Sequence, residues 1–145
     1  MTNCIVDIAD FKEISEIHCQ IPEFGHENAD FFSKRCNDKA FLALKCKVDG
    51  NPAGYAVSYD RYDDNSLYIW MVASLPAYRK RGVFSALARE TEAWAKKNGY
   101  NALKIKTRNN RREMLHWLVK NDFQFMEVDI RDPVHENRIQ LIKSL

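Results

Sequence analysis

The sequence predicts one α/β domain over residues 1–145, built on a mixed sheet flanked by helices. Three observations predict this class. The length suits one domain with a sizeable core. Segments with strand periodicity and segments with helical periodicity follow one another without an intervening repeat or linker. In the middle of the chain, the apolar run from Ser66 to Ser74 passes through a short basic loop into an amphipathic helix.

The first half of the chain contains four strands and two helices. Cys4 to Ile8 is apolar enough for a strand, and Asp10 with Glu13 three residues later predicts a capped helix that ends before Pro22. A second helix is expected from Glu27 to Cys36. The remaining strands are expected over residues 40–48, 52–59 and 66–74, with a hairpin turn at 49–51.

The second half continues with two helices and three strands. Val83, Leu87 and Trp94 recur at helical spacing until Asn98-Gly99. Residues 103–107 alternate between apolar and lysine positions, which predicts a strand with one solvent-exposed face. Asn109 or Asn110 is expected to cap a helix over 111–121, and strands are expected over 123–130 and 138–145.

Composition narrows the class of protein. Hydrophobic residues make up 46% and charged residues 29%, as in ordinary soluble globular proteins. The net charge of +2 gives no overall attraction to nucleic acid, and no apolar run reaches the ~18 residues of a membrane helix. The first seven residues lack the features of a signal peptide, so a cytoplasmic location is expected. The four cysteines, at positions 4, 19, 36 and 46, have no metal-ligand spacing, so we expect reduced thiols and no metal site.

The basic loop is the strongest functional signal. Arg79, Lys80 and Arg81 precede Gly82 at the start of a helix, where backbone N–H groups lack partners and the helix dipole is positive. This combination favours binding of a phosphate or pyrophosphate. Gly82 would let the backbone approach such a ligand closely. The alternative is a solvated basic helix start without a ligand.

The run from Arg79 to Phe84, Arg-Lys-Arg-Gly-Val-Phe, resembles the Arg/Gln-x-x-Gly-x-Gly/Ala pyrophosphate loop of the GNAT superfamily of N-acetyltransferases, in its small single-domain bacterial type. The preceding residues 75–78, the element order of the whole chain and the segment 109–123 resemble the same family. Phe84 stands where Gly or Ala is usual, and Asp122 stands where Gly is usual. The resemblance implies the GNAT fold, with a mixed, mostly antiparallel sheet.

The resemblance also implies acetyl-CoA as the cofactor and an amine of a small molecule or peptide as the acceptor, reacting by direct attack in a ternary complex. In the family, the strand before the loop binds the pantetheine arm and polarises the thioester carbonyl, the loop amides hold the pyrophosphate, and an asparagine touches the cofactor. The matching positions are Val72, Ala73 and Ser74 on the strand, Arg79, Arg81, Gly82, Val83, Phe84 and Ser85 in the loop and helix start, and Asn110 or Asn109.

Two residues are catalytic candidates. Tyr68 occupies the strand position where many relatives carry a general-base Glu, and it is expected to share one strand face with Trp70 and Val72. A tyrosine with a pKa near 10 is a poor base at neutral pH, so Tyr68 would order a water or bind the substrate, or simply be a half-buried aromatic. The usual general-acid Tyr is replaced by Leu118, expected to be core. Glu23 is the second candidate, in the loop that borders the acceptor site in this fold.

Several other polar and aromatic residues allow more than one interpretation. His26 and Glu27 neighbour Glu23, but a solvated loop residue and a first-turn helix residue explain them as well. His18, His116 and His135 have no partner recognisable from the sequence. An aromatic set would either wall an acceptor pocket or lie in the core: Phe24, Phe31, Phe32, Tyr59, Tyr68 and Trp70.

Two competing functions remain open. The absence of the usual Glu and Tyr suggests a GNAT-fold module that binds acyl-CoA without turnover. Nucleic-acid binding is the other alternative, through a basic set consisting of Arg79, Lys80, Arg81, Arg108, Arg111 and Arg112. We expect no nucleic-acid partner, because the phosphates of CoA account for the basic set. We also expect no membrane partner, because no apolar run is long enough for a membrane helix. Pairing of the last strands of two copies would give a homodimer.

Overall fold

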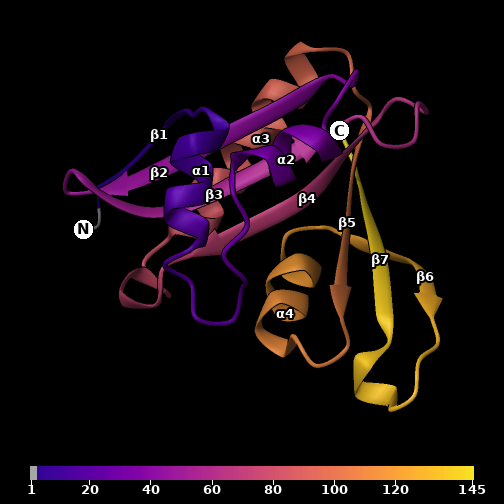
Figure 1. Ribbon diagram of the computed structural model, residues 1–145. Helices are drawn as coiled ribbons and strands as arrows, with labels where there is room; N and C mark the ends of the chain where they lie inside the picture. Colours follow the sequence, from indigo (N-terminus) through magenta and orange to yellow (C-terminus); the bar gives the residue numbers. More distant parts are fainter. Residues whose placement is uncertain (1–2) are drawn as a thin grey trace.

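A seven-stranded mixed sheet organises the computed structural model, which describes residues 3–145 (Figure 1). The strands lie in the order β1-β2-β3-β4-β5-β7-β6. They are β1 (Cys4–Ile8), β2 (Phe41–Val48), β3 (Asn51–Tyr59), β4 (Ser66–Ser74), β5 (Ala102–Arg108), β6 (Gln124–Asp129) and β7 (Arg138–Ser144). The helices are α1 (Phe11–His18), α2 (Ala29–Arg35), α3 (Val83–Lys97) and α4 (Arg112–Lys120), with short 3-10 turns η1 (Pro76–Tyr78) and η2 (Val134–Glu136). Each predicted strand and helix is present.

The strand pairing confirms the predicted mixed, mostly antiparallel sheet. β4 and β5 pair in parallel, and all other neighbouring strands pair antiparallel. The predicted hairpin joins β2 to β3 through Asp49 and Gly50, both with positive φ, 51° and 81°. Two successive positive φ angles give the turn whose twist matches that of the flanking strands.

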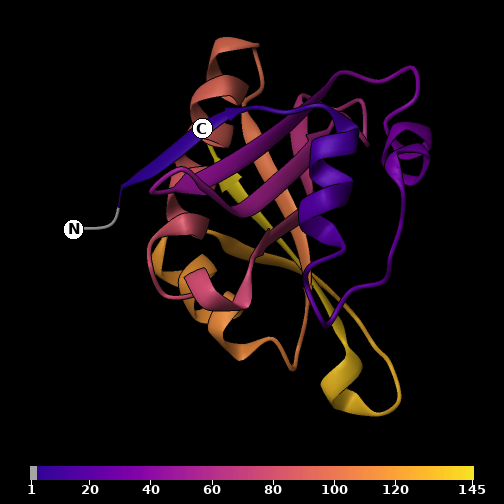
Figure 2. The same ribbon diagram turned by 60° about the vertical axis from the view of Figure 1, so that its left-hand side comes forward.

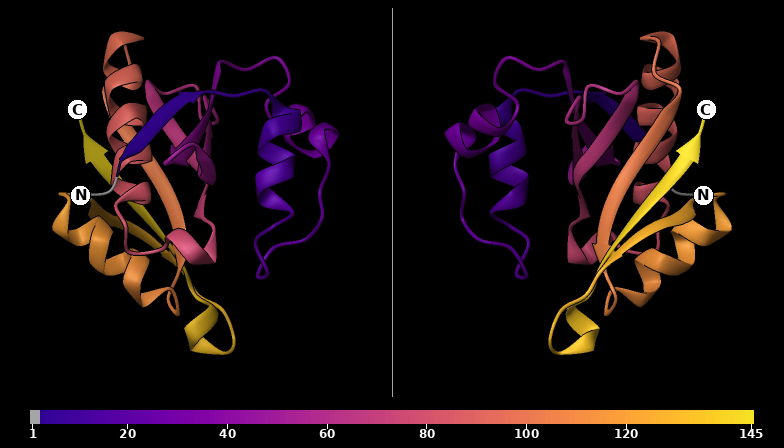
Figure 3. Two further views of the ribbon diagram at one scale, coloured as in Figure 1. Left: turned by 90° about the vertical axis from the view of Figure 1, so that its left-hand side faces the viewer. Right: turned by 90° about the vertical axis from the view of Figure 1, so that its right-hand side faces the viewer.

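The helices cover the two faces of the sheet unequally. In Figure 3, α1 and α2 lie on one side of the sheet and α3 and α4 on the other. Under α1 and α2, an aromatic-rich cluster joins β2, β3 and β4, whereas α3 and α4 cover clusters that draw on both halves of the sheet. Figure 2 shows the turn between β6 and β7 projecting beyond the helices at one end of the molecule. Within residues 3–145, no helix is long and apolar enough to cross a membrane.

The first two helices are shorter than predicted. The expected capping box of α1 is present, since the Glu13 amide donates to Asp10 and the Asp10 amide donates to Glu13. The helix ends at His18, although Ile21 beyond it is still buried. α2 begins at Ala29 rather than at Glu27, because the side chain of Asn28 caps it by accepting the Phe31 amide.

A β-bulge corrects the prediction that Tyr68, Trp70 and Val72 share one face of β4. The register with β3 shifts between Val57 and Ser58, which leaves Trp70 as the extra residue on β4. As a result, Tyr68 and Trp70 pack toward α1 and α2, whereas Val72 packs toward α3 and α4. Beyond the bulge, the side chains of β4 that would have faced α1 and α2 therefore face α3 and α4.

Candidate functional site

β4 and β5 diverge halfway along their length. Their parallel pairing ends at Ile69 and Ile105, although both strands continue for several residues. The backbone groups of the later half of β4 therefore have no strand partner on that side. Val72, Ala73 and Ser74, predicted to bind the pantetheine arm, lie on this free half and are half-buried. We call the gap between the two strands the β4–β5 opening.

The start of α3 presents free backbone donors next to this strand. Gly82 is the N-cap residue, with a φ of 84° and no side-chain cap. The first hydrogen bond of the helix runs from the Ala86 amide to the Gly82 carbonyl at 3.0 Å. The amides of Val83, Phe84 and Ser85 precede that bond, so they have no acceptor within the helix. A polyanion would find here both the donors and the positive end of the helix dipole.

Gly54 on β3 allows α3 to begin close to the sheet. A Cβ at this position would lie 2.5 Å from the carbonyl oxygen of Ala73 and 2.7 Å from Cγ1 of Val83. Any larger residue would therefore displace β4 or the first residue of α3. This residue was not predicted from the sequence, although a glycine inside a strand is a signal for close backbone approach.

Each of the three cations of the basic loop, Arg79, Lys80 and Arg81, contacts a neighbouring side chain. Arg79, predicted to bind the cofactor, forms an ion pair with Glu23, predicted to act in catalysis. Lys80 lies 3.7 Å from a carboxylate oxygen of Glu113 on α4. The Arg81 guanidinium lies 5.4 Å from the ring centre of Tyr78. The structure thus brings Glu23 and Arg79 together and links the α1–α2 loop to the basic loop.

Phe84, the departure from the family pattern, packs against α4. Its ring meets that of Trp117 edge to face, with the centroids 4.5 Å apart. The Trp117 indole N–H donates to the Ser85 hydroxyl at 3.0 Å. These two contacts hold α4 against the first turn of α3, so the bulky residue has a structural role at this position.

The prediction that Asn109 or Asn110 caps α4 is wrong. The N-cap residue is Arg111, and it makes no side-chain cap. The Asn109 side chain instead donates to the carbonyl oxygen of Val134 at 3.2 Å, and that of Asn110 to a carboxylate oxygen of Glu136 at 3.4 Å. The asparagines thus fasten the β5–α4 turn to the β6–β7 connection, because that connection offers oxygen acceptors within reach.

Tyr68 is poorly placed to act as a base. Its side chain is buried, and its ring contacts those of Tyr59 and Tyr62, both at 5.8 Å between centroids. Burial raises the pKa of Tyr68, and the Arg61 guanidinium over its ring offsets only part of that rise. The phenol therefore stays protonated at neutral pH.

The aromatic set expected either in a pocket or in the core packs together. Phe32, Tyr59 and Tyr68 are buried, and Phe24 and Trp70 pack against the same cluster. Phe31 stacks on Trp70 with 5.5 Å between centroids, at the exposed rim of the cluster. Leu118, expected in the core, is fully buried.

A buried chain of polar groups was missed by the sequence analysis. The His18 ring is 2% exposed, with Nδ1 2.7 Å from the Tyr55 hydroxyl and Nε2 2.9 Å from a carboxylate oxygen of Glu27. The hydrogen bond from His18 lowers the pKa of Glu27. An ionised Glu27 accepts the Nε2–H, and in the neutral imidazole Nδ1 then accepts the Tyr55 hydroxyl. The spacing of His18 from Ile14 on the apolar face of α1 was the available signal.

The α1–α2 loop depends on this chain for its position. The Ser15 hydroxyl donates to the Glu27 carbonyl at 2.8 Å. Gly25 lets the loop fold against Glu27, since a Cβ there would lie 2.6 Å from the carboxylate. The loop that carries Glu23 is therefore anchored at its far end to α1 and β3.

The sequence matches the model of one protein family. The model of the acetyltransferase (GNAT) family matches residues 10–123. No curated protein matches the chain by sequence. Among solved structures, an IAA acetyltransferase from Bacillus cereus has a TM-score of 0.81 at 16% identity, covering 99% of this chain and 100% of its own. The ribosomal-protein-S18-alanine N-acetyltransferase of Escherichia coli has a TM-score of 0.81 at 14% identity, covering 98% and 94%.

A third structure was solved with a ligand. The acetyltransferase of Bacillus subtilis, in complex with CoA, has a TM-score of 0.77 at 14% identity and covers 100% of this chain and 99% of its own. At identities of 14–16%, the structural similarity supports only the fold. The match to the family model supports membership of the family.

Proposed function

Because the chain belongs to the GNAT family of acetyltransferases, we propose that it transfers the acetyl group of acetyl-CoA to an amine of a small molecule or peptide. The observation that carries this proposal is the meeting of two features at the β4–β5 opening. One is the unpaired half of β4, and the other is the uncapped start of α3. The first suits an extended amide-bearing ligand, and the second suits a pyrophosphate. The similar Bacillus subtilis acetyltransferase was solved in complex with CoA.

The predicted cofactor residues other than Arg79, which pairs with Glu23, have the following proposed roles. Backbone groups of Val72, Ala73 and Ser74 bind the pantetheine arm. The amides from Arg81 to Ser85 bind the pyrophosphate, with added charge from Arg81, which lacks a carboxylate partner among the described residues. Asn110 follows β5, and its side chain donates to Glu136; we propose that it contacts the cofactor from the β5 side of the opening.

Acetyl-CoA supplies an acetyl group activated as a thioester. The residues of this chain bind and orient it, and the N–H groups near Val72 polarise the carbonyl oxygen. The acceptor amine must lose a proton before it attacks. Tyr68 is protonated, and Glu23 is engaged by Arg79. We therefore propose that the neutral fraction of the amine, rather than a tuned base, sets the rate.

The same observations favour a second candidate, a module that binds acyl-CoA without turnover. A buried phenol and a paired carboxylate leave neither catalytic candidate free in this structure. This candidate predicts cofactor binding at the same opening but no product.

One experiment separates the two candidates. Acetyl-CoA is incubated with the protein and a panel of small amines, amino acids and peptides. Release of CoA and the mass of the acetylated product are measured together, and binding of acetyl-CoA is measured by calorimetry. Product from at least one amine supports the transferase. Binding without any product supports the binding module, and absence of binding excludes both.

A further inference from the structure

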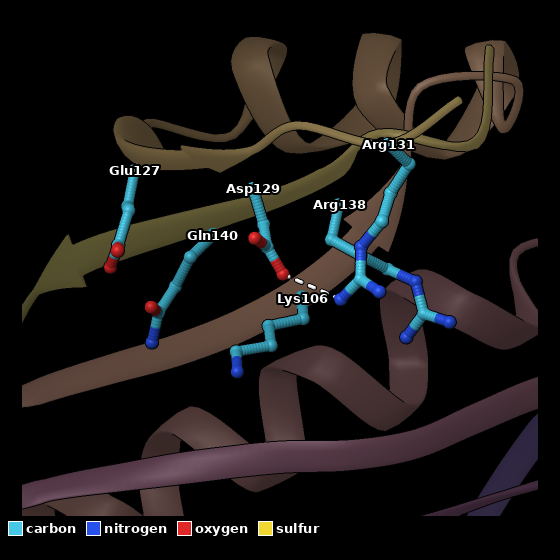
Figure 4. A pocket seen from close by; sticks show the side chains of 6 residues that line it. All are labelled: Lys106, Glu127, Asp129, Arg131, Arg138 and Gln140. Carbon is cyan, nitrogen blue, oxygen red and sulfur yellow. Dashed lines mark hydrogen bonds and ion pairs between the residues drawn. The ribbon is translucent and has the colours of Figure 1, made fainter. Parts of the chain in front are cut away.

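A polar pocket of about 220 Å³ lies on the side of β5, β7 and β6 that α1 and α2 leave uncovered (Figures 3 and 4). The register places Lys106 beside Gln140 and Gln140 beside Glu127, and it places Arg138 beside Asp129. Figure 4 shows these side chains extending to the same side of the strands. The residues that line the pocket are Lys106, Glu127, Asp129, Arg131, Arg138 and Gln140.

The charges of the pocket are unevenly compensated. Arg131 donates to a carboxylate oxygen of Asp129 at 2.6 Å, so these two neutralise each other. Within residues 3–145, neither Lys106 nor Arg138 has a carboxylate oxygen within 4.0 Å. Glu127 also makes no ion pair there, but Gln140 lies between it and Lys106 in the register. Lys106 on β5 and Arg138 on β7 are thus two cations without an ion pair among the described residues, against one such carboxylate, Glu127 on β6.

The pocket borders the β4–β5 opening. Lys106 directly follows Ile105, the last residue of β5 that pairs with β4. It extends to the face opposite the core under α3 and α4, to which Ile105 belongs. The Gln140 amide donates to the Tyr62 hydroxyl at 3.1 Å, and the Tyr62 ring contacts that of Tyr68. Through Gln140, the pocket lining therefore contacts Tyr62, and Tyr62 contacts Tyr68 on β4.

We propose that this pocket binds the carboxylate of the acceptor, and that the acceptor is a small amino acid whose amine points to the β4–β5 opening. This inference rests on the proposed transferase function. Lys106 and Arg138 supply the charge, and the guanidinium can bind both carboxylate oxygens. The size suits the acid group of a small molecule, since pockets for larger ligands are typically several hundred Å³. A phosphate would satisfy the same cations, so the test includes one.

The test compares acceptors that carry a carboxylate with acceptors that lack one. Initial rates at saturating acetyl-CoA are measured for glycine, β-alanine and γ-aminobutyrate, for their carboxamides, and for aminoethyl phosphate. We expect kcat/KM of the best acid to exceed that of its amide by at least about tenfold, as one charge-assisted hydrogen bond allows. An amide lowers the pKa of the neighbouring amine, so reactivity alone favours the amide and cannot produce this preference.

Variants locate the effect. Lys106→Gln and Arg138→Gln should lower the acid-to-amide ratio to one or below, because intrinsic reactivity favours the amide, without changing the KM of acetyl-CoA. Lys104→Gln is the matched control, because Lys104 lies two positions earlier on the same face of β5 but is paired with Asp64 at 2.7 Å. This control should keep the wild-type ratio.

The outcomes separate this inference from the proposed function. If amides or peptides react as well as the acids, the inference is overturned and the transferase stands. A preference for aminoethyl phosphate over every acid overturns the carboxylate assignment. If no amine is acetylated, the transferase fails, and calorimetry of the same acids with the CoA-bound protein decides the pocket. Binding that Lys106→Gln abolishes supports the pocket, and absence of binding overturns it.

Discussion

The two halves of one sheet face differ in what covers them. Over β2, β3 and β4, the face is packed by α1 and α2 through a cluster that includes Phe32 and Tyr55, both fully buried. Over β5, β7 and β6, the same face is polar and open, and every residue of β6 is exposed. The β4–β5 opening separates the halves. The covered half stabilises the fold, and the open half is free to bind a ligand.

The strand sequences explain this difference. Seven consecutive residues of β3, from Ala53 to Tyr59, are buried. Because side chains on both faces of this strand are buried, helices must pack against both faces. In β5, buried Leu103 and Ile105 alternate with Lys104 and Lys106, so only one face needs cover.

The largest expected effect is on stability in the covered half. Phe32→Ala removes a ring that contacts His18, Tyr55 and Trp70, and should lower the free energy of unfolding by about 3–5 kcal/mol. Phe125→Ala on β6 is the control, because its side chain is 57% exposed. It should cost less than about 1 kcal/mol. Phe125 lies opposite Leu141, on the face toward α4, so it represents an exposed ring of the same sheet. Urea denaturation measures both variants, and equal losses would contradict the claim that burial under α1 and α2 stabilises the fold.

The next effect concerns the opening itself. Gly82→Asp places a negative charge where the pyrophosphate is proposed to bind, and should weaken acetyl-CoA binding about 100-fold or more, equivalent to at least about 2.7 kcal/mol. Gly99→Asp is the control, since Gly99 has a similar φ of 86° and, as at Gly82, nothing within 4 Å of its Cβ position. Calorimetry should show unchanged binding for Gly99→Asp. Unchanged binding for Gly82→Asp would remove this loop from the site.

A smaller effect is expected at the anchor of the α1–α2 loop. Glu27→Gln should cost on the order of 1 kcal/mol at pH 7, because it weakens the hydrogen bond with His18. The folded-state pKa of Glu27 lies below its usual value of 4.5, so this stabilisation is present above pH 4.5 and is lost as the pH falls through the folded-state pKa.

Unfolding free energies from pH 7 down to pH 3 check this expectation. The difference between wild type and Glu27→Gln should shrink over the acid end of the range. Exposed Glu16, on the same helix, provides the control Glu16→Gln, which should stay within about 0.5 kcal/mol of wild type. A difference that grows on acidification would contradict the ionised state of Glu27.

The smallest effect is expected at Tyr68. Burial raises the pKa of Tyr68, so Tyr68→Phe should change kcat/KM by less than about threefold, and both proteins should show the same pH profile. That profile should rise about tenfold per pH unit through the mildly alkaline range, because an aliphatic amine has a pKa near 10.4. A plateau near pH 7 that Glu23→Gln or His26→Ala abolishes would instead reveal a base in the α1–α2 loop.

The sequence predicted what depends on local patterns. Hydrophobic periodicity predicted each strand and helix, and Asp10, Asp49 and Gly50 predicted a cap and a turn that the structure contains. The basic loop was found for the same reason, since the helix start and the cations are adjacent in sequence.

What the sequence did not predict depends on contacts between distant segments. The bulge at Trp70 is set by pairing with β3, and no periodicity encodes one extra residue. The partners of His18 come from β3 and the α1–α2 loop. The asparagines were expected to cap α4 because local rules favour it, but acceptors on the β6–β7 connection compete successfully for Asn109 and Asn110.

The central claim is that acetyl-CoA binds in the β4–β5 opening against the start of α3. Titration of the ¹⁵N-labelled protein with acetyl-CoA, followed through backbone amide chemical shifts, tests it most directly. We expect the largest changes at residues 72–74 and 81–85, with smaller ones near Asn110 and almost none along residues 124–129 of β6. Changes centred on β6 and the Lys106–Arg138 pocket, with residues 81–85 unaffected, would contradict it.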